Sequence, residues 1–197
     1  MKRSYFLAIL VIAVTGTLAA ISTFRGLRTP AKDSAVLAPI SLTVDVSERR
    51  LHVIRGGDVV RSYPVAVGKQ SHPTPKGSFS VRRIIWNPRW VPPDSEWARD
   101  ERPRAPGDPR NPMGKVKIFF REPDYYIHGT RDLDSLGDAA SHGCIRMANA
   151  DIVSLARLAM ENGGAPRSPN WFRRILNRVR STEEVRLSNP VVLRIRA

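Results

Sequence analysis

Ser141-His142-Gly143-Cys144-Ile145-Arg146 places a thiol, an imidazole and a flexible glycine next to one another. Cys144 is the only cysteine of the chain, so it cannot form an intramolecular disulfide. The stretch Tyr125-Tyr126-Ile127-His128-Gly129-Thr130 lies upstream and supplies a second imidazole. Two alternatives follow for Cys144. It is a small buried apolar residue, or it is a reactive nucleophile activated by its neighbours.

The neighbours of Cys144 favour nucleophilic chemistry. A thiol attacks as its thiolate, and a nearby imidazole can accept the proton. His128 comes from another segment and can approach freely, whereas His142 is constrained by its position two residues before the thiol. Gly143 permits a sharp bend that could direct the N–H groups of Gly143 and Cys144 at one point, as an oxyanion hole. A zinc site built from these three side chains would have no clear fourth ligand, so we expect neither a metal nor another cofactor.

The N-terminus predicts export. Met1-Lys2-Arg3 is basic, and no charged residue follows from Tyr5 to Phe24. Residues 1–24 are therefore interpreted as a signal peptide, with Thr17-Leu18-Ala19 as a cleavage site, or as a single membrane anchor. Residues 25–38 are expected to form a linker and residues 39–197 one domain. The protein would then work in the periplasm or cell-wall compartment, free or anchored to the inner membrane.

The chain is strongly basic, with a net charge of +14 among 197 residues. Such a surface attracts polyanions. Because the N-terminus predicts export, we expect anionic cell wall or lipid head groups rather than nucleic acid as partners. The content of 42% hydrophobic and 25% charged residues is typical of a globular domain.

The domain is predicted to be mostly β, a sandwich or barrel-like sheet with two short helices. Alternating apolar residues and turn signals indicate strands. The expected strands cover 42–46, 51–54, 59–67, 79–81, 116–120, 125–127, 185–187 and 191–195. Asp151 to Met160 has the periodicity of a helix with Asn149 as its N-cap. Ser168-Pro169 opens a second, basic helix over residues 169–180, either a packed amphipathic helix or a contact for anionic polymer and membrane.

The segment from Trp86 to Pro112 interrupts this pattern. It is rich in proline and contains three of the four tryptophans, at 86, 90 and 97. Proline opposes long regular elements, so a long ordered loop is expected. The loop either covers a binding site or is merely held to the core by its tryptophans.

The two stretches around His128 and Cys144 resemble the signature of the L,D-transpeptidase (YkuD-type) catalytic domain. The resemblance extends over residues 39–160. Its further motifs are Val44 to Leu51, Pro64 to Gly68, Thr74 to Phe79, Asn111 to Gly114, and Asp151. It implies an exported enzyme that acts on peptidoglycan stem peptides. Cys144 would attack the carbonyl of the third residue of a tetrapeptide stem and release the terminal D-alanine. An amine would resolve the acyl-enzyme: another stem in a 3–3 cross-link, a lysine of a wall-anchored lipoprotein, or a D-amino acid.

The resemblance also implies roles for individual residues. His128 would be the base, oriented through the carbonyl group of Gly129. Pocket and oxyanion roles fall to Gly129, Ser141, His142 and Gly143, and substrate contacts to Tyr126 and Arg146. A guanidinium suits a carboxylate well, although Arg146 could equally form a structural salt bridge.

Two other functions compete with transpeptidation. An L,D-carboxypeptidase or amidase would use the same Cys144 and His128 but transfer the acyl group to water. A non-catalytic wall-binding domain would retain the fold without turnover. Nothing in the sequence identifies the acceptor.

Overall fold

The computed structural model describes residues 38–197. The predicted export segment, 1–24, and all but the last residue of the predicted linker, 25–38, lie outside the described residues. Strands dominate the described part, accompanied by two α-helices, which confirms the predicted fold class. No helix in this part is long and apolar enough to span a bilayer.

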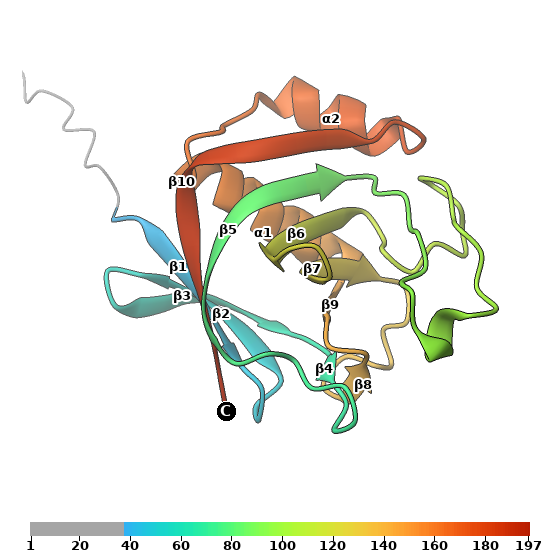
Figure 1. The fold of residues 1–197 in the computed structure, drawn as a ribbon. Helices are drawn as coiled ribbons and strands as arrows, with labels where there is room; N and C mark the ends of the chain where they lie inside the picture. Colours follow the sequence, from blue (N-terminus) through green and yellow to red (C-terminus); the bar gives the residue numbers. More distant parts are fainter. Residues whose placement is uncertain (1–37) are drawn as a thin grey trace, which may run out of the picture. The chain divides into compact units, whose positions relative to one another are not determined.

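Eight strands form one curved sheet. They are β1 (Ile40–Asp45), β2 (Arg50–Arg55), β3 (Asp58–Pro64), β5 (Gly77–Trp86), β6 (Val116–Arg121), β7 (Tyr125–Thr130), β9 (Ile145–Ala148) and β10 (Glu183–Arg196). Their order across the sheet is β3-β2-β1-β10-β5-β6-β7-β9 (Figure 1). Two short strands, β4 (Val67–Gly68) and β8 (Ala139–Ser141), pair separately.

The last strand corrects one sequence prediction. Residues 185–187 and 191–195 were expected to form two strands, but both belong to β10, which pairs with β5 on one side and with β1 on the other. The register with β5 shifts between Arg186 and Val191. Pro190 lies in this irregularity, where its missing N–H costs the ladder no hydrogen bond. The chain therefore passes the proline without ending the strand.

The edge of the sheet that carries the two motifs also differs from expectation. β8 and β9 were not predicted, and β7 was expected to end at Ile127. Because β9 pairs in parallel with Ile127 to Thr130, β7 continues past His128. His128 consequently lies within a strand that has neighbours on both sides, instead of at a strand end.

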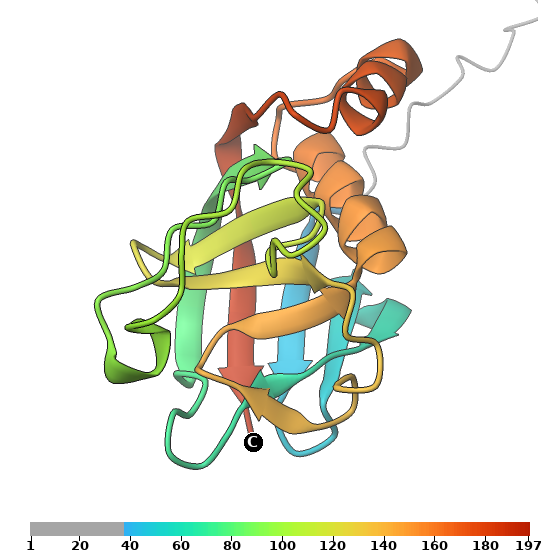
Figure 2. The same cartoon turned by 90° about the vertical axis from the view of Figure 1, so that its right-hand side faces the viewer.

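Helix α1 (Asn149–Asn162) packs against β6, β7, β9 and β10 (Figure 2). Its apolar face is buried as predicted, at positions 152, 155, 156 and 159. The predicted N-cap is wrong, because Ala148 occupies that position and Asn149 is already helical. The Asn149 side chain instead accepts the Lys115 N–H at 2.8 Å and donates to the Thr130 carbonyl oxygen at 3.0 Å. It thereby joins the start of β6 to the end of β7.

Helix α2 (Pro169–Asn177) is a packed amphipathic helix. Ser168 caps it by accepting the Trp171 N–H, and Phe172 and Ile175 are buried. The helix ends at Asn177, three residues before the predicted end at residue 180. Asn87 accounts for this early end. Its side-chain amide donates to the carbonyl oxygens of residues 175, 178 and 181, at 2.8 to 3.2 Å.

Candidate active site

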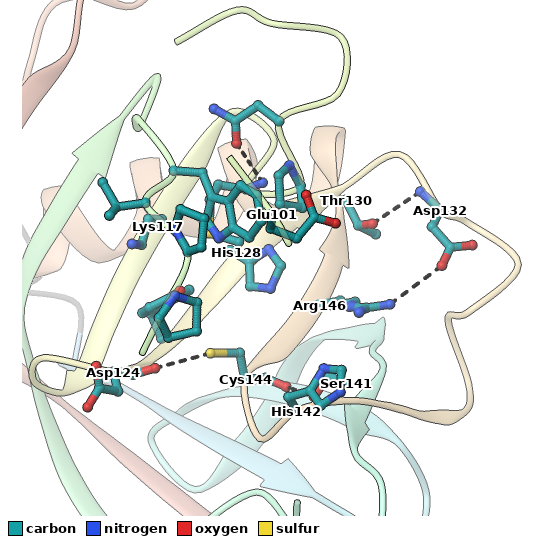
Figure 3. A pocket seen from close by; sticks show the side chains of 18 of the residues that line it. Glu101, Lys117, Asp124, His128, Thr130, Asp132, Ser141, His142, Cys144 and Arg146 are labelled. Atoms are coloured by element: carbon teal, nitrogen blue, oxygen red, sulfur yellow. Dashed lines mark hydrogen bonds and ion pairs between the residues drawn. The ribbon is translucent and has the colours of Figure 1, made fainter. Parts of the chain in front are cut away.

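Three adjacent strands bring the two sequence motifs together. In the sheet register, His128 of β7 lies opposite Lys117 of β6 on one side and Arg146 of β9 on the other. Paired residues project from the same face of a sheet, so these three side chains form one row. Figure 3 shows Lys117 and Arg146 on either side of His128, with Cys144 beneath. Cys144 immediately precedes β9, so its position follows from the same pairing.

A cavity of about 730 Å³ lies over this row. Its walls come from the loop after β5, from β6 and β7, and from the turn between β8 and β9. Six of the eight predicted site residues line it: Tyr126, His128, Ser141, His142, Cys144 and Arg146. Gly129 and Gly143 do not line it. The Gly129 carbonyl group binds the His128 ring, and the Gly143 N–H binds the Ser141 hydroxyl. The size of the cavity is that of a typical small-ligand site.

His128 is held as a neutral imidazole. Its side chain is buried, and its Nδ1–H donates to the Gly129 carbonyl oxygen at 2.8 Å, which leaves Nε2 as the unprotonated nitrogen. Burial is the largest cause that lowers the pKa of His128 to about 4, and the charges of Arg146 and Lys117 lower it further. The carbonyl groups of Gly129 and Pro112 oppose this shift. The ring is therefore available as a base at neutral pH.

Cys144 is a free thiol directed toward a backbone carbonyl. Its Sγ donates to the Asp124 carbonyl oxygen at 3.3 Å. Burial raises the pKa of Cys144, whereas the backbone N–H and hydroxyl of Tyr126 and the ammonium of Lys117 favour the thiolate. Within residues 38–197 there is no hydrogen bond between Sγ and the His128 ring. The thiol is thus protonated in this arrangement and must turn to reach the imidazole.

The turn that presents Cys144 is closed by Ser141. The Ser141 hydroxyl donates to the Cys144 carbonyl oxygen and accepts the Gly143 N–H at 3.1 Å. Gly143 has φ +105°, a conformation that residues with a side chain rarely adopt. Two N–H groups were expected to form the oxyanion hole, but that of Gly143 already binds Ser141. Of the two expected donors to an oxyanion, the Cys144 N–H is therefore the one that does not bind Ser141.

Gly129 is required by close packing. A Cβ atom at this position would lie 2.4 Å from Asn149 Oδ1, the same oxygen that holds the start of β6. The absent side chain lets β7 approach α1, and this approach keeps the Gly129 carbonyl group beside His128. The fold thus requires a glycine at position 129, which the spacing of the motif alone could not reveal.

The proline-rich loop does both of the things considered from sequence. Trp86, which ends β5 and packs in the core, and Trp90 are both buried at the start of the loop, and Trp90 pairs with Arg104 further along it. Trp97, on the short 3₁₀ helix Glu96–Ala98, stacks on the His142 ring with centroids 4.1 Å apart. The His72 ring also contacts His142 in an edge-to-face arrangement, with centroids 5.0 Å apart. The loop therefore forms a wall of the cavity.

Arg146 lines the cavity and also lies 3.5 Å from the Asp132 carboxylate. The ion pair links β9 to the loop after β7, so the structural alternative considered for Arg146 is present. Both groups are partly exposed, and such pairs contribute little to stability. The guanidinium thus keeps donors that can face the cavity.

Lys117 is a charged cavity residue that sequence reasoning missed. Its Nζ lies 3.8 Å from the Tyr126 ring centroid and 5.1 Å from that of Phe119, and it lines the cavity. The available signal was the alternation Val116-Lys117-Ile118, which places a cation on the opposite face from the core. Among the described residues, no cluster of three His, Cys, Asp or Glu side chains is arranged to hold a metal ion.

Comparison with known proteins agrees with this geometry. Residues 39–176 match the family model of the L,D-transpeptidase catalytic domain. A putative L,D-transpeptidase of Fuscovulum blasticum is 36% identical over 121 residues, 59% of this chain and 63% of the relative. The putative L,D-transpeptidase YkuD of Bacillus licheniformis is 33% identical, over 61% of this chain and 60% of the relative. For YkuD of Bacillus subtilis the identity is 31%, over 71% of this chain and 67% of the relative.

The chain spans less than two thirds of the first two relatives, so the match concerns the domain. Among solved structures, the catalytic domain of the E. faecium L,D-transpeptidase superposes with a TM-score of 0.50 at 15% identity, covering 80% of this chain and 96% of that one. This likeness concerns the fold. Because the family model covers most of the chain and the relatives agree with it, the chain belongs to the L,D-transpeptidase catalytic domain family.

Proposed function

We propose that this protein is an exported L,D-transpeptidase that acts on peptidoglycan tetrapeptide stems through a Cys144 acyl-enzyme. The observation that carries the proposal is the shared cavity wall of Cys144 and His128, with the imidazole neutral and its Nδ1–H already donated to Gly129. An unprotonated Nε2 can take the thiol proton. The residues expected to bind substrate, Tyr126 and Arg146, line the same cavity.

The first half of the reaction transfers the stem to the enzyme. The Cys144 S–H leaves the Asp124 carbonyl oxygen and gives its proton to His128 Nε2. The thiolate attacks the carbonyl carbon of the third stem residue, and the Cys144 N–H stabilises the resulting oxyanion. His128 then returns the proton to the departing amine of D-alanine as the C–N bond breaks. A thioester between Cys144 and the stem remains.

The second half transfers the stem to an acceptor. His128 removes a proton from an incoming amine, which attacks the thioester carbonyl carbon and displaces the Cys144 thiolate. A side-chain amine of another stem would give a 3–3 cross-link, while a lipoprotein lysine or a D-amino acid would give an attached product. Water in place of the amine would make the protein a carboxypeptidase or amidase.

Location and anchoring belong to the same proposal. Residues 1–24 would direct export as a signal peptide or retain the chain at the inner membrane, and residues 25–38 would link that segment to the domain. Peptidoglycan lies in the compartment that such a segment would reach. The basic surface would favour an anionic wall polymer over nucleic acid there.

The test is incubation of the purified full-length chain with disaccharide-tetrapeptide, followed by mass spectrometry of products and protein. Loss of D-alanine with formation of dimers supports transpeptidation. Tripeptide without dimers, also in the presence of D-amino acids and lipoprotein, supports the hydrolase. We expect Cys144→Ala to lower turnover by at least about a thousandfold while the variant stays folded.

Unchanged tetrapeptide, with no acyl adduct on wild-type Cys144, would contradict the catalytic assignment. Binding of stem peptides by both wild type and Cys144→Ala, without turnover in either, would support the wall-binding domain instead. Cell fractionation with an antibody tests location, since a cytoplasmic chain would contradict export.

A further inference from the structure

Lys117 lies at the floor of the cavity without an acidic partner. Within residues 38–197, no ion pair and no side-chain hydrogen bond includes its ammonium group. Its Nζ rests instead against the rings of Tyr126 and Phe119. A partly buried ammonium has lost water, and aromatic faces replace only part of that hydration. The arrangement leaves Nζ donors available to a ligand.

The position of Lys117 links it to the reacting groups. It lies opposite His128 in the β6–β7 register, and Arg146 lies opposite His128 on the other side. Two cations thus flank the imidazole in one row, as Figure 3 shows. Arg146 already has an acidic neighbour in Asp132, whereas Lys117 has none within ion-pair distance. Of the two cations, Lys117 is therefore the one whose charge is not balanced by a neighbouring carboxylate within ion-pair distance.

Other charged groups face Lys117 as well. Cys144 as a thiolate and the Asp124 carboxylate favour its protonated form, and Arg83 disfavours it. Burial is the largest cause that lowers the pKa of Lys117 to about 8, so the group stays mostly charged at neutral pH. Arg83 lies over the same Phe119 ring, 4.6 Å from its centroid, and is itself paired with Glu122 and Glu184.

We propose that Lys117 is a substrate-binding residue whose ammonium group binds a carboxylate of the donor stem peptide, across His128 from Arg146. This inference rests on the proposed function. The chemistry recognised is a carboxylate within reach of the scissile carbonyl group. Two carboxylates of a tetrapeptide donor meet this description: the C-terminal carboxylate of the leaving D-alanine, and a side-chain carboxylate on the third residue.

The first experiment uses the single thiol and does not depend on turnover. Because Cys144 is the only cysteine, alkylation of the full-length chain reports on one site. Iodoacetate carries a carboxylate and iodoacetamide does not. We expect Lys117→Met to lower the rate with iodoacetate, relative to the rate with iodoacetamide, about tenfold. This is the effect expected from losing one hydrogen bond to a charged group. Lys117→Arg should restore much of the ratio.

The control is Lys115→Met, which removes the same charge just before β6, at a residue that does not line the cavity. It should leave the ratio unchanged. A fall of both rates in Lys117→Met at a constant ratio would overturn carboxylate binding and assign Lys117 to stabilisation of the thiolate. An unchanged ratio with unchanged rates would also overturn the proposal. Circular dichroism melting establishes that each variant is folded.

The second experiment identifies the carboxylate. Donor tetrapeptides with a free acid, a C-terminal amide or a side-chain amide are compared with wild type and Lys117→Met. We expect the substitution to raise KM about tenfold with little change in kcat for the free acid. The effect should vanish for the amide that removes the recognised group, because the partner is then absent from both proteins.

The outcomes separate this inference from the function on which it rests. Turnover by wild type with equal effects of Lys117→Met on all three donors would overturn the carboxylate assignment alone. A loss of kcat at constant KM would do the same. No release of D-alanine by wild type from any donor would overturn the proposed function, and the assignment of Lys117 to its substrate with it.

Discussion

At the scale of single residues, the turn before β9 controls how the thiol is presented. Gly143 holds φ +105°, and a Cβ atom there would lie 3.0 Å from Cε1 of Tyr125. We expect Gly143→Ala to lower the free energy of unfolding by more than about 1 kcal/mol, because it adds a steric contact to backbone strain. It should also slow alkylation of Cys144. Urea unfolding and iodoacetamide kinetics measure the two effects.

Gly137 provides the matched control for this substitution. It has φ +95°, but a Cβ atom there would meet nothing within 4 Å. Gly137→Ala should therefore cost about 1 kcal/mol through strain alone and leave the reactivity of Cys144 unchanged. Equal effects of the two substitutions on stability and alkylation would show that contact with Tyr125 plays no part.

Sequence reasoning at this scale identified side chains that share the cavity, but not how they are oriented. Cys144 and His128 share the cavity because their motifs lie on paired segments. The hydrogen bond from the thiol to Asp124 and that from Gly143 to Ser141 depend on the closure of two turns. Such closure is a tertiary property, so the sequence could not show that the Gly143 N–H, one of the two expected oxyanion donors, binds Ser141. Lys117 was missed because its importance arises only from the register with β7.

At the scale of elements, the end of α2 depends on a side chain far away in the sequence. Asn87 is buried, adopts φ 46° and donates its amide to carbonyl groups at the end of the helix. We expect Asn87→Ala to lower the free energy of unfolding by about 2–3 kcal/mol, since one buried and two partly buried carbonyl groups lose their donor. Urea denaturation followed by circular dichroism measures the change.

A glycine at the same position separates two causes. Asn87→Gly keeps the left-handed backbone accessible but removes the amide, so it should remain destabilising. Hydrogen exchange at the amides of residues 174–178 should increase in both variants. If Asn87→Gly were as stable as the wild type, the contribution of Asn87 to stability would come from its backbone conformation and not from its hydrogen bonds.

The elements with strong local patterns were predicted, and those that depend on distant partners were not. The hairpin of β2 and β3, the buried face of α1 and the start of α2 follow from turn residues, periodicity and a cap. β8 and β9 are short, and they form strands because they pair with β4 and β7. The ends of α1 and α2 shifted because Asn149 and Asn87 serve neighbouring elements.

At the scale of the whole molecule, the sheet is assembled by long-range pairing. β1 pairs in parallel with the last strand of the chain, and β10 also pairs with β5. Composition and alternation could predict a mostly β domain, whereas this order brings together residues from opposite ends of the domain, which no local pattern specifies. The resemblance to a known family indicated the overall fold, which local sequence patterns could not specify. The cavity is a consequence of this closure, since its walls come from three separate regions.

Folding of the whole domain should depend on pH through His128. The unfolded chain holds this proton with the ordinary pKa of 6.5, whereas burial lowers the pKa to about 4 in the folded protein. Between these values the unfolded state binds more protons, so the free energy of unfolding rises with pH. The contribution is fully present above pH 6.5 and is lost as the pH falls through about 4. It should amount to about 3 kcal/mol.

Urea unfolding of the full-length chain at several values between pH 4 and pH 7 measures this dependence. His128→Gln should flatten the slope in that interval, because the group that must stay neutral is gone. An unaltered slope in His128→Gln would mean that other groups govern the acid response. The lowered pKa of buried His128 would then not account for the loss of stability in acid.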